Sequence, residues 1–173
     1  FMKNTAIIIP TRLNAKRFPN KPLAKIKGIP MIVHVMNRAK EANVGEVFVA
    51  TPDNEIVDIV SQNGGEAILT KNDNIFSGSD RIYEVYSKKL KNKTDFIINL
   101  QGDMPNINPK CINKLAQFMK SKGQDIGTLC SLIDNRKDIT NPNIVKVQLE
   151  KDLKNEDFFP AKDFFRIKKD LNN

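Results

Sequence analysis

The sequence predicts an α/β fold in which a mostly parallel sheet lies between two layers of helices. Short runs of β-branched residues alternate along the chain with segments whose apolar residues recur at helical spacing. Strands and helices that alternate in this way form one sheet with right-handed crossover connections. We therefore expect a three-layer, Rossmann-like arrangement in a single domain covering residues 1–173.

The expected elements follow one another at ordinary lengths. Strands are expected at residues 7–9, 46–51, 66–70, 94–100, 126–133 and 144–149. Helices with an inward apolar face are expected to begin near Pro30, Asn54, Asp80 and Pro109. Gly64 and Gly123 are placed to end two of these helices. The strand at 94–100 is the most hydrophobic, so we expect it in the middle of the sheet.

The composition is that of a globular protein with a basic balance. The formal net charge is +8, which suits a small polyanionic substrate such as a nucleoside triphosphate. The lysines are scattered and few aromatic residues lie among them, which disfavours nucleic-acid binding. No apolar run approaches the length of a membrane span. Cys111 and Cys130 have no metal-ligand spacing, so we expect a cytoplasmic protein.

A cationic loop follows the first expected strand. Pro10 ends this strand, because proline cannot donate to a sheet ladder. The loop carries Arg12, Arg17 and Lys21, and two further prolines restrict its backbone. Open α/β sheets bind phosphate-bearing ligands just outside the carboxyl ends of their strands. We therefore predict that these cations bind phosphates, with a solvated basic loop as the alternative.

Two later segments are candidates for the same site. The Ser-Gly-Ser turn at 77–79 precedes a helix that Ser79 or Asp80 can cap, and its N–H groups can serve an anion or a base edge. Simple capping explains the turn equally well. Asp103 follows the strand at 94–100, and an acid among phosphates needs a cation between them. Asp103 is therefore predicted to bind Mg²⁺, the alternative being an Asx turn or a helix cap.

These segments resemble four motifs of one enzyme family, in the same order. The first loop is similar to Pro-Ala-Arg followed by Arg-x-Pro-Gly-Lys-Pro-Leu, with Asn20 in place of glycine. Residues 77–81 resemble Ser-Gly-Thr-Asp/Glu-Arg, and residues 141–147 resemble Asn-Pro-Asn-x-Val-Lys-Val. Residues 101–105 resemble Gln-Gly-Asp-Glu-Pro, with Met104 in place of glutamate. The family is that of the 3-deoxy-manno-octulosonate cytidylyltransferases, also called CMP-KDO synthetases.

The resemblance implies a fold of the nucleotide-diphospho-sugar transferase type and an Mg²⁺-dependent nucleotidyltransferase. Such an enzyme joins CTP to KDO, releases pyrophosphate and supplies CMP-KDO for lipopolysaccharide synthesis. CTP and KDO would be its partners, with neither nucleic acid nor a membrane involved, and full-length members are expected to form homodimers.

The resemblance also implies roles for individual residues. Catalytic roles fall to Arg12, Lys21 and Asp103. Nucleotide contacts fall to Pro10, Arg12, Arg17, Lys21, Ser77 and Gly78. Sugar contacts fall to Gln101 and Arg166, and metal binding falls to Asp103.

Members of this family continue well beyond the length of the present chain and carry a second metal-binding acid there. We therefore expect residues 1–173 to be a nucleotidyltransferase domain that is incomplete at its C-terminus. Two alternatives stay open: a truncated, catalytically inactive CTP-binding remnant, and an enzyme similar to CMP-sialic acid synthetases. A basic nucleic-acid-binding module ranks below both.

Overall fold

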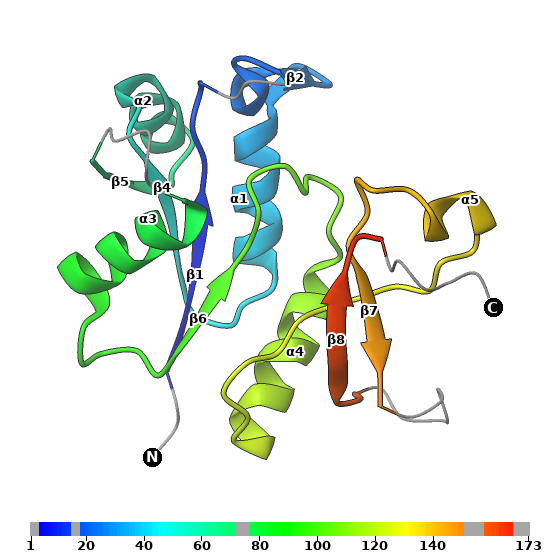
Figure 1. Cartoon of the computed structure of the whole chain (residues 1–173). Helices are drawn as coiled ribbons and strands as arrows, with labels where there is room; N and C mark the ends of the chain where they lie inside the picture. Colours follow the sequence, from blue (N-terminus) through cyan, green and yellow to red (C-terminus); the bar gives the residue numbers. More distant parts are fainter. Residues whose placement is uncertain (1–3, 15–17, 72–76, 151–157, 168–173) are drawn as a thin grey trace. The chain divides into compact units, whose positions relative to one another are not determined.

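The computed structural model describes residues 4–14, 18–71, 77–150 and 158–167 (Figure 1). The chain divides into two compact units, Phe1–Gly127 and Thr128–Asn173, and each is described by itself. Among the described residues, no helix combines the length and the apolarity that crossing a membrane requires.

The first unit is built on a parallel sheet. Strand β1 pairs with β4 and β6, and β4 pairs with β5, in each case in parallel. The spatial order is β5 (Glu66–Leu69), β4 (Glu46–Thr51), β1 (Thr5–Pro10), β6 (Phe96–Asn99). The order of strand addition reverses between β1 and β6. Such a reversal is the topological switch point at which open α/β sheets bind their ligands.

Helices cover both faces of this sheet. They are α1 (Met31–Glu41), α2 (Asn54–Gln62), α3 (Gly78–Val85) with its π-helical continuation η2 (Tyr86–Leu90), and α4 (Pro109–Lys122). A 3₁₀ turn, η1 (Lys21–Leu23), and a two-stranded hairpin, β2 (Lys25–Ile26) and β3 (Ile29–Pro30), lie between β1 and α1.

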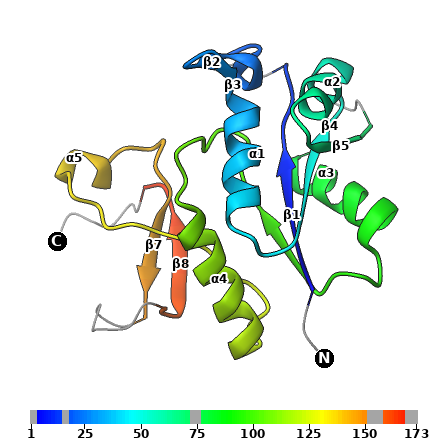
Figure 2. The same cartoon turned by 180° about the vertical axis from the view of Figure 1, so that it is seen from behind.

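The side chains of β1 belong to two separate apolar clusters. Ile7 and Ile9 pack with buried residues of α1, α2 and α4. Ala6 and Ile8 pack with buried residues of α3 and η2. The clusters alternate because successive side chains of a strand point to opposite faces. Figures 1 and 2 show α1 and α3 on opposite sides of the sheet, so the predicted three-layer, Rossmann-like fold is confirmed.

The ends of α4 show why the sequence folds as predicted locally. The side chain of Asn108 accepts a hydrogen bond from the N–H of Lys110, and Pro109 occupies the first turn, where its missing N–H costs nothing. Gly123 ends the helix with φ of 65°, a left-handed conformation that glycine adopts without steric strain.

Two expectations about strands are wrong. Within the described residues β6 pairs with β1 alone, so it lies at an edge of the sheet and not in the middle. Residues 126–133 form no strand, and the side chains of Ile126 and Leu132 are 91% and 70% exposed. Apolar character favours a strand only where a neighbouring strand supplies hydrogen bonds and a covered face, and this segment has neither.

The second unit contains a short helix, α5 (Arg136–Ile139), and an antiparallel pair, β7 (Lys146–Leu149) and β8 (Ala161–Phe165). Lys146 is buried, and its ammonium donates to the backbone carbonyls of Asn141, Ile144 and Arg166. An ammonium has three donors, so these carbonyls satisfy it and allow its burial. Lys146 therefore fixes the loop before β7 to the end of β8.

Candidate functional site

The site lies at the carboxyl ends of β1 and β6, on either side of the switch point. Beyond β1, the N–H of Thr11 still donates to the carbonyl of Ala50 at 2.9 Å. The N–H of Leu13 then donates to Oδ2 of Asp53 at 2.8 Å. These two bonds hold the backbone on both sides of Arg12, whose side chain is exposed. The first cation of the loop therefore stands on a fixed backbone and faces solvent.

The end of the cationic loop is fixed as well. The N–H of Asn20 donates to the carbonyl of Leu13 at 2.9 Å, which closes the loop on itself. Asn20 adopts a left-handed conformation with φ of 58°, as expected of an asparagine in the place of a glycine. Pro22 is buried in the 3₁₀ turn that follows, so the backbone of Lys21 is anchored at its neighbour.

Lys21 and Asp103 meet in an ion pair. Nζ of Lys21 lies 2.8 Å from Oδ2 of Asp103, although 82 residues separate them in the sequence. Their side chains are 40% and 53% exposed, so water screens this pair and its contribution to stability is small. The pair matters for the site because it holds the loop after β1 next to the turn after β6.

Gly102 allows this approach. A Cβ atom on Gly102 would lie 3.1 Å from the carbonyl oxygen of Pro10 and 3.1 Å from Cβ of Thr11. Both distances are tighter than ordinary van der Waals contact, and Pro10 presents backbone there, which cannot easily move. The turn that carries Asp103 therefore packs directly on the end of β1.

The Ser-Gly-Ser turn packs on the same proline. A Cβ atom on Gly78 would lie 3.5 Å from Cγ of Pro10, an ordinary contact distance. Ser77 caps α3: its Oγ accepts from the N–H of Asp80, while the N–H and Oγ of Ser77 donate to the Asp80 carboxylate, both at 2.7 Å. The hydrogen bonds from the side chain and backbone of Ser77 lower the pKa of Asp80. The cap is therefore Ser77, and the expectation of Ser79 or Asp80 is corrected.

This cap leaves donors at the start of α3. Helix geometry gives the first N–H groups no intrahelical acceptor, and those of Gly78 and Ser79 lie in this position. The positive end of the helix dipole lies there too. The turn can therefore bind an anion or the acceptor edge of a base.

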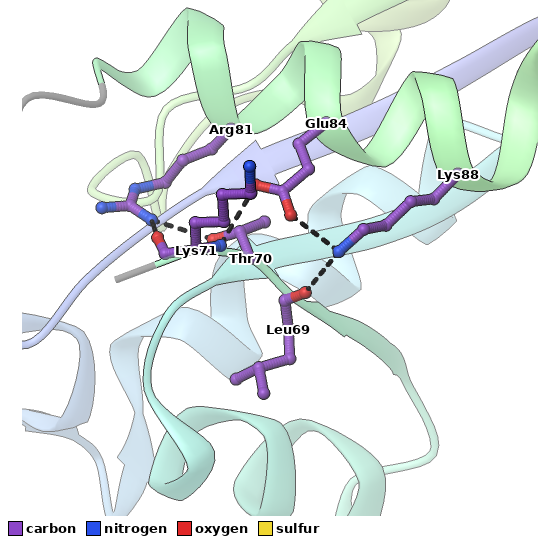
Figure 3. Close-up of polar contacts among 6 residues, drawn as sticks. All are labelled: Leu69, Thr70, Lys71, Arg81, Glu84 and Lys88. Atoms are coloured by element: carbon purple, nitrogen blue, oxygen red, sulfur yellow. Dashed lines mark hydrogen bonds and ion pairs between the residues drawn. The ribbon is translucent and has the colours of Figure 1, made fainter. Parts of the chain in front are cut away.

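A buried arginine joins the first turn of α3 to the end of β5 (Figure 3). Nη1 of Arg81 donates to Oγ1 of Thr70 and to the carbonyl of Lys71, both at 2.8 Å. Arg81 is 3% exposed, and burial, together with the nearby charge of Arg12, lowers its pKa.

One turn further along α3, Oε2 of Glu84 accepts the N–H of Lys71 at 3.1 Å. Oε1 of Glu84 pairs with Lys88 at 2.6 Å, and Lys88 also donates to the carbonyl of Leu69.

The donor set around Asp103 fits a magnesium ion that arrives with phosphates. The described residues contain no group of three or more acidic, histidine or cysteine side chains able to hold a metal alone. Mg²⁺ commonly takes one or two carboxylates and completes its shell with phosphate oxygens and water. A single exposed carboxylate beside cations therefore suits a metal–nucleotide complex better than a free ion.

The described part of the chain brings several of the predicted site residues to one place. Pro10 contacts the turns that carry Gly78 and Gly102, and Lys21 contacts Asp103. Gln101 directly precedes this turn, and its amide donates to Oδ1 of Asn99 at 2.8 Å.

The structure does not place two of the predicted site residues, Arg17 and Arg166, at this site. Arg17 falls outside the described residues. Arg166 belongs to the second unit, where its guanidinium donates to the carbonyls of Pro142 and Asn143. Its expected contact with a sugar acid remains a prediction.

Sequence reasoning missed two residues that build the site. Asp53 directly precedes α2, yet its carboxylate does not cap that helix and accepts the N–H of Leu13 instead. Arg81 was noted only as a motif residue. The available signal was a charged residue close to the carboxyl end of a neighbouring strand. This signal does not tell which group the charged residue bonds.

The fold and the site together define an α/β protein whose candidate site lies at the switch point of a parallel sheet. The profile of the cytidylyltransferase family matches residues 6–173, so the chain belongs to the cytidylyltransferase family.

Relatives and solved structures agree with this membership. A 3-deoxy-manno-octulosonate cytidylyltransferase of Rhizobium leguminosarum bv. trifolii is 46% identical over 142 residues, which are 82% of this chain and 56% of that protein. The corresponding protein of Brucella canis is 45% identical over 144 residues, 83% of this chain and 57% of that protein. The chain thus spans little more than half the length of these curated relatives.

Two solved structures show the same fold. A CMP:2-keto-3-deoxy-manno-octonic acid synthetase complexed with CTP is 39% identical, with a TM-score of 0.82 over 95% of this chain and 64% of that one. A cytidylyltransferase of Leptospira borgpetersenii is 21% identical, with a TM-score of 0.59 over 70% of this chain and 51% of that one. The second likeness shows the fold alone.

Proposed function

We propose that this chain forms the nucleotide-binding part of a cytidylyltransferase that activates KDO as CMP-KDO from CTP. The observation that carries the proposal is the ion pair of Lys21 and Asp103. It brings a lysine that can bind phosphate and a carboxylate that can bind a metal ion together at the switch point. The names of the similar proteins support KDO as the sugar and CTP as the nucleotide.

In the proposed reaction, the anomeric hydroxyl of KDO attacks the α-phosphorus of CTP and a new O–P bond forms. The bond from the α-phosphorus to the α,β-bridging oxygen breaks, pyrophosphate leaves, and the hydroxyl proton passes to water. Such transfers depend on positioning and on neutralising charge, and need little covalent chemistry from the protein. Arg12 and Lys21 bind the triphosphate, with Arg17 as a third expected contact. Lys21 also stabilises charge that develops on the departing pyrophosphate.

The remaining residues orient the substrates. The N–H groups at the start of α3, near Ser77 and Gly78, receive the base, and the ring of Pro10 packs beneath that turn. Gln101 and Arg166 are proposed to contact the sugar acid. Asp103 would hold Mg²⁺, which neutralises phosphate charge when bound.

The test combines binding and turnover on the same protein. Calorimetry with CTP and MgCl₂ should show binding, and a pyrophosphate-release assay with KDO should show turnover. Lys21→Met should lower the rate of release about 10²–10³-fold, the usual effect of losing one preorganised charge partner. Lys25→Met, which removes an exposed lysine on β2, is the matched control and should leave the rate unchanged. Absence of CTP binding would contradict the proposal.

A second candidate is a CTP-binding protein without turnover. The observation that favours it is Met104, which stands where the family motif of residues 101–105 has a second acid beside Asp103. It predicts CTP binding that depends on Lys21 but no release of pyrophosphate with KDO present. The two assays therefore distinguish the candidates directly.

A further inference from the structure

We propose that Arg81 is a positioning residue for base recognition, acting through Thr70 and Lys71 without touching the nucleotide. The inference rests on the proposed function, because it assumes that the turn at Ser77 and Gly78 receives the base. It concerns what holds this turn at a fixed distance from the phosphate-binding loop.

Arg81 is bonded in two directions. Its main-chain N–H donates to the carbonyl of Ser77, the residue that caps α3. Its guanidinium donates to Oγ1 of Thr70 and to the carbonyl of Lys71, beyond the end of β5. A single residue thus joins the candidate base turn to the carboxyl edge of the sheet, and Figure 3 shows its two bonds at that edge.

The other end of this connection is also fixed. The N–H of Thr70 donates to the carbonyl of Thr51 at 2.8 Å, at the end of β4. Oγ1 of Thr51 lies 3.5 Å from the Asp53 carboxylate that holds Leu13, next to Arg12. A chain of hydrogen bonds therefore runs from the base turn through Thr70 to the backbone that carries the first phosphate-binding cation.

The chemistry of Arg81 suits this role better than direct contact with substrate. The residue is 3% exposed, and burial makes its positive charge costly unless hydrogen bonds compensate for it. The planar guanidinium can donate to a hydroxyl and a carbonyl from one fixed orientation, which the flexible ammonium of lysine cannot reproduce. Arg81 thus contributes geometry to a site in which exposed Arg12 and Lys21 contribute charge.

The experiment compares two ligands, CTP and inorganic tripolyphosphate, each with MgCl₂, by calorimetry on the whole chain. Tripolyphosphate lacks a base, so its affinity reports on the phosphate-binding residues and not on base recognition. Arg81→Lys keeps the charge and removes the planar guanidinium that donates to both Thr70 and Lys71. It should weaken CTP binding about tenfold while leaving tripolyphosphate binding unchanged. Thr70→Val removes one acceptor at constant volume and should weaken CTP binding about threefold, again without affecting tripolyphosphate.

Lys88→Gln is the matched control, because Lys88 also joins this helical segment to the end of β5, but its bonds go to Glu84 and to the carbonyl of Leu69. It should change neither affinity. Equal losses for both ligands in Arg81→Lys and Thr70→Val would show a general structural defect and would overturn the inference, as would no loss for either ligand. If the unaltered protein binds CTP no more tightly than tripolyphosphate, the proposed function itself fails.

Discussion

At the scale of single residues, the site depends on a few close approaches. Gly102 has no Cβ to meet the backbone of Pro10, and Gly78 fits against the ring of the same proline. Pro10 is thus the residue on which the turns after β6 and before α3 both rest. The first loop follows from it directly, so three segments distant in sequence share one point of contact.

Asp103→Asn should change CTP binding in opposite directions with and without magnesium. Without magnesium, the substitution removes a negative charge and releases Lys21, so CTP should bind about threefold more tightly, within the range of exposed ion pairs. With magnesium, the gain in affinity that the unaltered protein shows should disappear, because the metal loses its carboxylate. Calorimetry with and without MgCl₂ measures both effects.

Asp58→Asn is the control for net charge, since Asp58 is exposed on α2. It should leave the magnesium effect intact. An unchanged magnesium effect in Asp103→Asn would show that this carboxylate does not bind the metal.

At the scale of elements, helix α3 connects recognition with architecture. Its first turn carries the capping box of Ser77 and Asp80 and ends at Arg81, and the side chains of Arg81 and Glu84 bond the residues just after β5. These residues share one face because positions three and four apart are neighbours on a helix. The helix therefore presents N–H donors at its N-terminus, while side chains on one of its faces fix it to the residues after β5.

Ser77→Ala should destabilise the protein and weaken CTP binding. Loss of an N-cap side chain costs about 1 kcal/mol of unfolding free energy. Urea denaturation followed by circular dichroism measures this change. Asn108→Ala removes the corresponding cap of α4 and should cost a similar free energy without affecting CTP binding. Equal CTP affinities for the two variants would show that the start of α3 does not bind the nucleotide.

The pairing of Glu84 should make part of the stability acid-sensitive. Burial acts to raise the pKa of Glu84, but the hydrogen bonds from Lys88 and from the backbone of Lys71 outweigh it, so the pKa lies below its ordinary value of 4.5. The unfolded state then binds more protons than the folded state near this pH, so stability rises with pH there. The contribution is present above the unfolded value and is lost as pH falls through the folded one.

Glu84→Gln should therefore be less stable than the unaltered protein at about pH 6, and the difference should shrink towards about pH 3. Urea denaturation at a series of pH values checks this. A difference that stays constant with pH would show that the glutamate contributes packing and no charge.

At the scale of the whole molecule, the sequence predicted what depends on local pattern. The buried face of α1, the left-handed Asn20 and both ends of α4 follow from periodicity and from the preferences of single residues. The reversal of strand order and the edge position of β6 depend on pairing between distant segments, which hydrophobicity does not encode. For the same reason the bond from Leu13 to Asp53 could not be foreseen.

The exposed segment at residues 126–133 should be a site of early proteolysis. It has no regular structure, and Ile126 and Leu132 are 91% and 70% exposed. Thermolysin cleaves beside large apolar residues, and a protease needs an accessible, extended backbone. Mass spectrometry of a brief digest should detect cuts within 126–133 before any cut within α1. Resistance of this segment would show that it packs against another surface in solution.

The pairing of Lys21 with Asp103 bears on the form in which a nucleotide enters. In the structure each charge is compensated by the other, so we expect this pair to attract a bare triphosphate only weakly. A nucleotide that already carries its magnesium offers a replacement partner to both side chains at once. The protein would then exchange one neutral arrangement for another, and would select the metal-loaded nucleotide from the mixture in the cell.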